Sequence, residues 1–339
     1  MRLRTALLLG ALVAAAVAAG TIAHVRSRQN ALAERLLRDT LERGVAFPVV
    51  TEGRVRVLMG ARWQSGGAST RQLGRAALID LDVGGSPVTV LDDGGRLWRL
   101  GDQSATPLGR SDKRVDWALL ASNYRIRGGG LGAIIGRPCR EVRLVSRRTG
   151  RTAEALWIDP GTRLVLVRET YDVDGHLVQA STVEMARFHD DRRTTAAVEQ
   201  ALALRPQAPE EQPLTDAEFA DRSGFAPLRP AHVPKGYREI GLYARTCPHG
   251  RTYAELVYFD GLRVMSVLER PGGGPGGGGG RGQGHGWRRG QGREMESAEP
   301  ALVDEGQAKT VRVRRGTVRV FLTGDLTQEE ILRVINSIP

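Results

Sequence analysis

Side chains with catalytic or metal-binding chemistry occur in three short clusters. Cys247-Pro-His249 offers a thiolate and an imidazole, but no other donor nearby completes the three or four ligands that zinc needs. His189-Asp190-Asp191 ends a strand pattern and is more typical of a solvated turn than of an acid–base pair. Asp172 and Asp174 are arranged as in a calcium loop, yet the turn is too short and lacks the distal glutamate. We therefore expect no catalytic residue and no metal.

Larger enzyme motifs are also missing. The sequence contains no Gly-x-Ser-x-Gly, no HExxH and no Walker loop. The glycines from Gly130 to Gly136 echo a dinucleotide-binding loop, but Arg137-Pro138 follows and a strand comes next instead of a helix. We predict a binding protein without enzymatic activity and without a cofactor. An exported enzyme is an alternative from another class of function, and a cleft of convergent polar side chains would favour it.

The stretch from Gly136 to Phe188 organises the chain as four antiparallel strands. Asp-Pro-Gly at residue 159 and Asp-x-Asp-Gly at residue 172 supply the conformations that tight hairpins need. Because side chains alternate across a strand, both faces of this sheet are partly apolar. The predicted strands are Arg140–Ser146, Ala153–Asp159, Leu164–Tyr171 and Leu177–Phe188.

A sheet with two apolar faces must cover both of them. The helices predicted in this half of the chain suffice for one face, which leaves an apolar groove on the other. We hypothesise that Trp157, Leu166 and Met185 line or border this groove, because they stand on the central strands.

The composition favours a folded protein that attracts anions. The chain has 339 residues, of which 41% are hydrophobic, a net charge of +11 and a pI near 10.5. Such a charge suits acidic partners, nucleic acid or anionic lipid headgroups. Arginine far outnumbers lysine, so an arginine-rich genome is an equally simple explanation. The two cysteines, Cys139 and Cys247, fit either one disulfide or two buried thiols.

The first residues predict export. Met1-Arg-Leu-Arg4 is a positive start, residues 5–23 are apolar, and small residues offer a cleavage point. Residues 1–23 are thus a signal peptide or a retained membrane anchor, and the rest of the chain should lie in the periplasm or another extracytoplasmic space. That location argues against nucleic-acid binding as the reason for the positive charge.

Helices and short strands precede the central hairpins. An amphipathic helix is predicted at Asn30–Arg43, a second helix at Asp112–Tyr124, and a glycine-rich loop at Arg127–Gly136. Strands separated by glycine pairs are predicted between the two helices. These strands are Phe47–Thr51, Arg54–Met59, Ala76–Leu81, Pro87–Asp92 and Arg96–Arg99.

The chain changes character after residue 193. Residues 24–193 are predicted as one domain, residues 194–223 as a linker with a short helix, and residues 224–339 as a second domain. A Gly/Arg-rich insertion at 271–293 has too little apolar surface to fold and is expected to be disordered. Asp260-Gly261 is expected to serve a tight turn and to make no contact of its own.

Short motifs in both halves resemble the MucB/RseB family. In the first half they are Gly136-Arg-Pro-Cys139, Leu156-Trp-Ile-Asp159, Glu169-Thr-Tyr-Asp172 and Gly175-His-Leu-Val178. In the second half they are Val233-Pro-Lys-Gly236-Tyr, Leu256-Val-Tyr-Phe-Asp-Gly-Leu262 and the closing Gly324-Asp-Leu-Thr327. Phe259 and Leu268 depart from the family pattern, and the insertion is not typical of it.

The resemblance implies an α+β protein with two domains. Its first domain would be a LolA-like curved antiparallel half-barrel with helices on one side, and its second a smaller α+β domain with an antiparallel sheet and a C-terminal helix. The family binds the extracytoplasmic segment of a transmembrane anti-sigma factor and senses lipid, as a negative regulator in sigma-E-type envelope stress signalling. The alternative on the same fold is a periplasmic lipid or lipoprotein carrier of LolA type.

Overall fold

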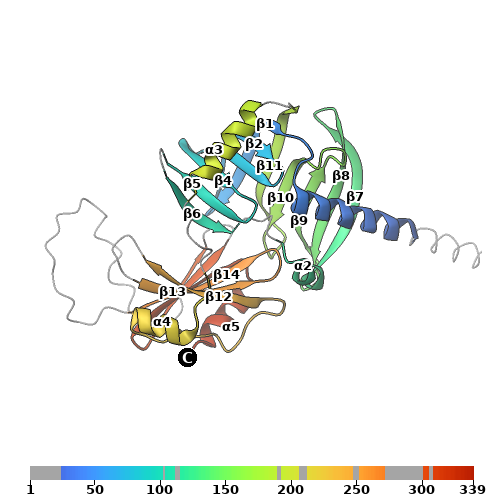
Figure 1. The fold of residues 1–339 in the computed structure, drawn as a ribbon. Helices are drawn as coiled ribbons and strands as arrows, with labels where there is room; N and C mark the ends of the chain where they lie inside the picture. Colours follow the sequence, from blue (N-terminus) through green and yellow to red (C-terminus); the bar gives the residue numbers. More distant parts are fainter. Residues whose placement is uncertain are drawn as a thin grey trace, which may run out of the picture.

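Two antiparallel sheets, joined by helices, make up a two-lobed molecule in the computed structural model (Figure 1). The structure describes residues 24–101, 104–110, 115–188, 192–205, 212–246, 252–271, 301–304 and 308–339. Within these ranges no helix is long and apolar enough to cross a membrane. The predicted signal peptide or anchor, the Cys247 and His189 clusters and residues 272–293 of the insertion lie outside the described residues.

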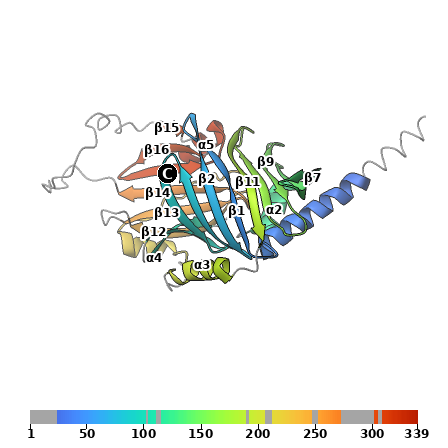
Figure 2. The same cartoon turned by 90° about the horizontal axis from the view of Figure 1, so that it is seen from above.

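The first lobe is built on an eleven-stranded sheet in the order β6-β5-β4-β3-β2-β1-β11-β10-β9-β8-β7. One half comprises β1 (Val49–Met59), β2 (Arg62–Leu73), β3 (Ala76–Val83), β4 (Ser86–Asp92), β5 (Arg96–Leu100) and β6 (Ala105–Arg110). The other comprises β7 (Tyr124–Ile134), β8 (Arg137–Ser146), β9 (Thr152–Ile158), β10 (Val165–Tyr171) and β11 (Leu177–Phe188). The sheet is curved and does not close, which confirms the predicted α+β class and the four central strands (Figures 1 and 2).

Helices cover different faces of this sheet at its two ends. The N-terminal helix, residues 24–43, buries Ala33 and Leu37 against Val142 and Leu156 of β8 and β9. Helix α3 (Arg192–Ala203) packs on β2 and β3, with its Ala201 against the cluster that holds Leu91 and Trp98. The register places this second cluster on the face opposite to the N-terminal helix.

The strand β7 corrects the predicted loop at Arg127–Gly136. Glycine occupies several positions in β7 because groups from other parts of the chain approach the backbone of this strand closely. A Cβ on Gly128 would lie 2.7 Å from the carbonyl oxygen of Gln29 in the N-terminal helix, and one on Gly129 would lie 2.0 Å from Glu141 Oε2. On Gly132 it would lie 3.0 Å from the Trp157 ring. Glycine in β7 therefore allows close packing and does not form a turn.

Glycines also misled the prediction at the start of the chain. Phe47–Thr51 and Arg54–Met59 are one strand, β1, with a bulge at Glu52/Gly53 where a turn was expected. Gly66 and Gly67 lie inside β2, which was not predicted; a Cβ on Gly66 would lie 1.7 Å from the carbonyl oxygen of Asp82 on β3.

The second lobe packs helices on one face of a six-stranded sheet. Its order is β12-β13-β14-β17-β16-β15. The strands are β12 (Arg238–Thr246), β13 (Thr252–Phe259), β14 (Val264–Pro271), β15 (Ala301–Asp304), β16 (Lys309–Arg315) and β17 (Val318–Gly324). Helix α5 (Gln328–Asn336) buries Ile331, Val334 and Ile335, and its predicted capping box is present: Thr327 Oγ1 accepts from the N–H of Glu330.

The residues between the lobes contain more helix than the sequence indicated. After α3, the chain forms α4 (Asp216–Ser223), which buries Phe219 in the core of the second lobe. Helix α4 begins with its own capping box, Thr215 with Glu218, and ends at Gly224 with φ +76°. The described residues between α3 and α4, and those from 224 to 237 before β12, lack regular structure.

Candidate functional site

The two lobes meet where helix α2 (Trp117–Asn123) touches the second lobe. Asn123, the last residue of α2, donates from Nδ2 to the carbonyl oxygens of Gly236 and Asp260, at 2.8 Å each. Gly236 and Asp260 belong to two of the three second-half motifs noted in the sequence. These motifs therefore form the contact surface of the second lobe.

Asp260 holds this contact through its buried carboxylate. Its Oδ2 accepts a 2.6 Å hydrogen bond from the hydroxyl of Tyr124, and its Oδ1 accepts from the N–H groups of Leu262 and Arg263 at 2.9 and 2.7 Å. Burial, together with the neighbouring Asp260 carboxylate, raises the pKa of Tyr124 well above its ordinary value. One side chain thus closes the β13–β14 turn and binds the first lobe.

Gly261 corrects the expectation that Asp260-Gly261 only makes a turn. Its φ is +100°, as a turn requires, but a Cβ there would also lie 2.6 Å from the backbone nitrogen of Leu120 in α2. The glycine is therefore both a turn residue and a point where the backbones of the two lobes approach closely. Beside it, Leu262 packs against the first-lobe cluster that holds Leu120 and Tyr124.

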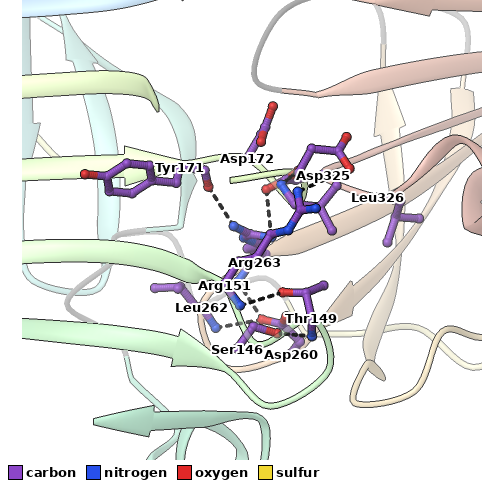
Figure 3. Close-up of polar contacts among 12 residues, drawn as sticks. Ser146, Thr149, Arg151, Tyr171, Asp172, Asp260, Leu262, Arg263, Asp325 and Leu326 are labelled. Atoms are coloured by element: carbon purple, nitrogen blue, oxygen red, sulfur yellow. Dashed lines mark hydrogen bonds and ion pairs between the residues drawn. The ribbon is translucent and has the colours of Figure 1, made fainter. Parts of the chain in front are cut away.

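Arg263 ties the hairpin to the β10–β11 turn (Figure 3). Its Nη2 donates to the carbonyl oxygen of Tyr171 at 2.6 Å, and its Nη1 pairs with Asp325 Oδ2 at 3.0 Å. Asp325 Oδ1 in turn accepts from the N–H of Val173 at 2.8 Å. Burial raises the pKa of Asp325 even with Arg263 beside it.

Ion pairs surround this centre. Lys309 Nζ lies 3.3 Å from Asp174 Oδ2, and two further pairs, Arg148 with Glu330 and Arg238 with Asp116, cross between the lobes. Burial alone would raise the pKa of Glu330, but the hydrogen bond and charge of Arg148, together with the hydrogen bonds from Thr327, outweigh it, and the pKa lies below its ordinary value. Directional polar contacts, with Leu262 as an apolar anchor, therefore hold the lobes together.

A polar hollow of about 550 Å³ opens on the first lobe beside this interface. Its side chains are already paired: Arg143 donates to both oxygens of Glu141 at 2.6 and 3.0 Å, and the Tyr171 hydroxyl donates to Glu169 at 2.7 Å. Among the described residues, no three His, Cys, Asp or Glu side chains gather as a metal would need. The hollow is therefore lined by charged and polar groups that pair with one another.

The three predicted groove residues do not lie together on one open surface. Leu166 is 1% exposed and packs in a cluster with the free, buried Cys139. Trp157 is half-buried against the same cluster and against the glycines of β7, while Met185 lies outside the cluster, 3.2 Å from Arg187 Nη2. Their part in ligand binding stays a prediction.

A half-buried apolar surface lies elsewhere on the first sheet. One cross-strand row runs through Val83, Gly66, Val55, Ser181, Arg168, Leu156 and Val142. Paired residues share a face, so this row runs from the part beneath the N-terminal helix to β1–β4. There the helix is absent, and Val55, Val57, Leu81 and Val83 are only half-buried. We name the half-buried side chains of β1, β3 and β4 on this face the aliphatic face.

Solved structures share this two-lobed fold. The Pseudomonas aeruginosa MucA/MucB complex matches with a TM-score of 0.59 and 20% identity, covering 91% of this chain and 98% of that chain. MucB in complex with MucA(peri) matches with a TM-score of 0.57 at 20% identity and the same coverage. A crystal structure of MucB alone gives 0.52 at 18% identity, again over 91% and 98%. No curated protein sequence matches the chain.

These likenesses define the fold as that of MucB, an open curved sheet followed by a smaller α+β lobe. The family described as MucB/RseB N-terminal domain matches residues 88–202. This match includes the first-half motifs that carry the resemblance to the MucB/RseB family.

Proposed function

We propose that this protein is a non-enzymatic regulatory protein that binds the extracytoplasmic segment of a transmembrane anti-sigma factor. The observation that carries the proposal is the fold match over nine-tenths of the chain to MucB, which has been solved together with MucA. The matching region covers 91% of this chain, so both lobes are available to the proposed partner. The satisfied polar pairs beside the interface support binding rather than catalysis.

Isothermal titration calorimetry tests this function. The purified chain is titrated with the extracytoplasmic segment of each single-span anti-sigma factor encoded in the same genome. We expect one of them to bind with a Kd of about 1 µM or tighter, equivalent to about 8 kcal/mol. The matched control is the extracytoplasmic segment of an unrelated single-span membrane protein. Absence of binding by every anti-sigma segment would overturn the proposal.

The protein acts outside the cytoplasm in this proposal. The positive start and apolar run at residues 1–23 support export, with either cleavage or retention as an inner-membrane anchor. We propose that the two lobes correspond to the two predicted domains, 24–193 and 224–339, the first extended by α3 and the second by α4, and that the contact through Asp260 and Arg263 sets their relative position.

Lipid sensing is part of the same proposal and is assigned to the aliphatic face. Val57 is half-buried there, while its neighbour Leu58 is half-buried on the opposite face of the same strand. We expect Val57→Asp to weaken the binding of a fluorescent fatty acid about tenfold or more, because a carboxylate among aliphatic chains is costly to desolvate. Leu58→Asp is the control and should bind as the parent does.

Equal affinities of the parent and Val57→Asp would remove the aliphatic face as a lipid site. Leu166 is unsuited to this test, because a carboxylate at a fully buried position would unfold the lobe. A lipid carrier remains the second candidate on the strength of the aliphatic face. The second lobe and its interface favour the regulator, since a carrier of LolA type needs the first sheet alone.

A further inference from the structure

The outer face of the second sheet carries a row of arginines. In β14, β17 and β16 the side chains of Val267, Leu322 and Val311 point into the core, so the alternate residues point away from it. Among the latter, Arg270 pairs directly with Arg319, and Arg319 pairs directly with Arg314. Three guanidinium groups thus stand side by side across three strands.

Phe321 anchors the arginine row. Arg270 Cζ lies 5.0 Å and Arg312 Cζ lies 5.7 Å from the centroid of its ring. Stacking on an aromatic face leaves the N–H edges of a guanidinium free for bidentate acceptors. We call Arg270, Arg312, Arg314 and Arg319 the arginine face.

None of these four arginines pairs with a carboxylate in the described part of the chain. The Nε of Arg312 is buried and donates to no protein atom. Glu255 is on the same face of β13, but it pairs with Arg245 at 2.7 Å. Like charges directly opposite each other destabilise a sheet, so this arrangement is disfavoured unless an anion joins it.

The arginine face lies away from the contact between the lobes. Asp260 and Asp325, which make that contact, lie beyond the opposite ends of β14 and β17. Arg270 stands five residues along β14 from Met265, which corresponds to about 17 Å of strand. A partner could therefore occupy the arginine face while the lobes stay docked.

We propose that the arginine face is a docking surface for an acidic segment of a protein partner. Carboxylates on one side of an extended peptide recur at about 7 Å, which lets successive acids reach guanidiniums on neighbouring strands. Planar guanidiniums bind carboxylates with two parallel hydrogen bonds. A membrane surface fits less well, because Phe321 is covered by two arginines. In addition, the exposed apolar side chain of Val264 lies at the opposite end of β14 from Arg270, so it cannot insert into a membrane beside the arginines.

Charge reversal tests the proposal on the purified chain. The double variant Arg270→Glu/Arg319→Glu is compared with Arg125→Glu/Arg127→Glu on β7, which removes the same charge from exposed arginines of the first lobe. The probe is a fluorescent peptide of alternating Glu and Ser. We expect the first variant to lose about tenfold or more in affinity, because each bidentate pair is a strong charge-assisted contact, and the control to lose little.

Each other outcome overturns the proposal. Equal losses in both variants would mean that only net charge matters. Unchanged peptide affinity, with reduced binding to phosphatidylglycerol vesicles, would identify a membrane surface instead, and competition by millimolar inorganic phosphate alone would identify a phosphate site. Circular dichroism checks the fold, because the two introduced carboxylates oppose each other while the one at position 319 also faces Arg314. The result is separate from the anti-sigma assignment, because the probe reports on this face whichever protein supplies the segment.

Discussion

Gly261→Ala is expected to undock the two lobes as well as strain a turn. With φ at +100°, alanine adds about 1–2 kcal/mol of backbone strain. Its Cβ would also stand 2.6 Å from the nitrogen and 2.7 Å from the Cα of Leu120, where backbone cannot yield as a side chain can. The hairpin must retreat from α2, and the hydrogen bonds of Asn123 and Tyr124 to Asp260 should break with it.

Small-angle scattering and thermal unfolding measure this effect. We expect a larger radius of gyration and a loss of about 3 kcal/mol or more, since strain and overpacking add. Gly316→Ala is the matched control: it has φ +55° in the β16–β17 turn, and a Cβ there meets nothing within 4 Å. If both variants lose the same stability and keep the parent's radius, the contact between Gly261 and α2 has no energetic role.

Glu269 is expected to make the second lobe less stable as the pH rises. Its side chain is fully buried on β14, its Oε2 accepts from the N–H of Leu228 at 2.8 Å, and its Oε1 has no protein partner. Burial raises the pKa of Glu269 to about 7, against the pull of that N–H and of Arg229. Tyr258 also faces it and adds no positive charge.

The direction follows from linkage. The folded pKa lies above the unfolded value, so the folded protein holds the proton more tightly. The stabilisation that protonated Glu269 gives the folded protein is complete below about pH 4.5. It is lost as the pH rises through about 7, by about 3 kcal/mol in total. The lowered pKa values of Asp93, Asp159 and Glu330 act in the opposite sense, and only as the pH falls below their unfolded values near 4.

Denaturant unfolding of Glu269→Gln between pH 5 and pH 8 checks this. Glutamine keeps the acceptor for Leu228 and stays neutral, so the variant should resemble the parent at pH 5 and exceed it by about 2–3 kcal/mol at pH 8. Glu329→Gln, on the exposed side of α5, should follow the parent throughout. If the stability of the parent protein does not change between pH 5 and pH 8, Glu269 titrates outside this pH range.

Local signals were enough to predict the elements that depend on local chemistry. Thr327 and Glu330 are three residues apart and satisfy each other, so α5 could be placed to within two residues of its start. The hairpins around Asp159 and Asp172 follow from turn residues in the same way. Helix α4 was overlooked, although Thr215 and Glu218 gave the same capping signal.

Glycine was misread wherever its partner is distant in sequence. In β7 and β2 it makes room for Gln29, Glu141 and the backbone of Asp82, and nothing beside Gly66 or Gly128 in the sequence announces those neighbours. Composition alone therefore favoured turns. A glycine flanked by strand-forming residues on both sides is the signal that could have indicated close backbone approach.

Only part of the site was predicted, because its contacting residues are also distant from each other in the sequence. The motifs around Gly236 and Asp260 were recognised as features of the second half, but Asn123 and Tyr124 are more than a hundred residues away from both. Arg263 and Asp325 are likewise brought together only by strand pairing. The aliphatic face depends on register across eight strands, which single-strand alternation cannot supply.

The first sheet ends in two strands, β6 and β7, that are not bonded to each other. A closed barrel has its girth fixed by strand number and stagger, but an open wall of strands is free of that constraint. Its curvature can relax or tighten through small changes of twist at each strand pair, without loss of a backbone hydrogen bond. The curvature of the sheet that carries the aliphatic face is thereby free to change while the ladder of strands stays intact.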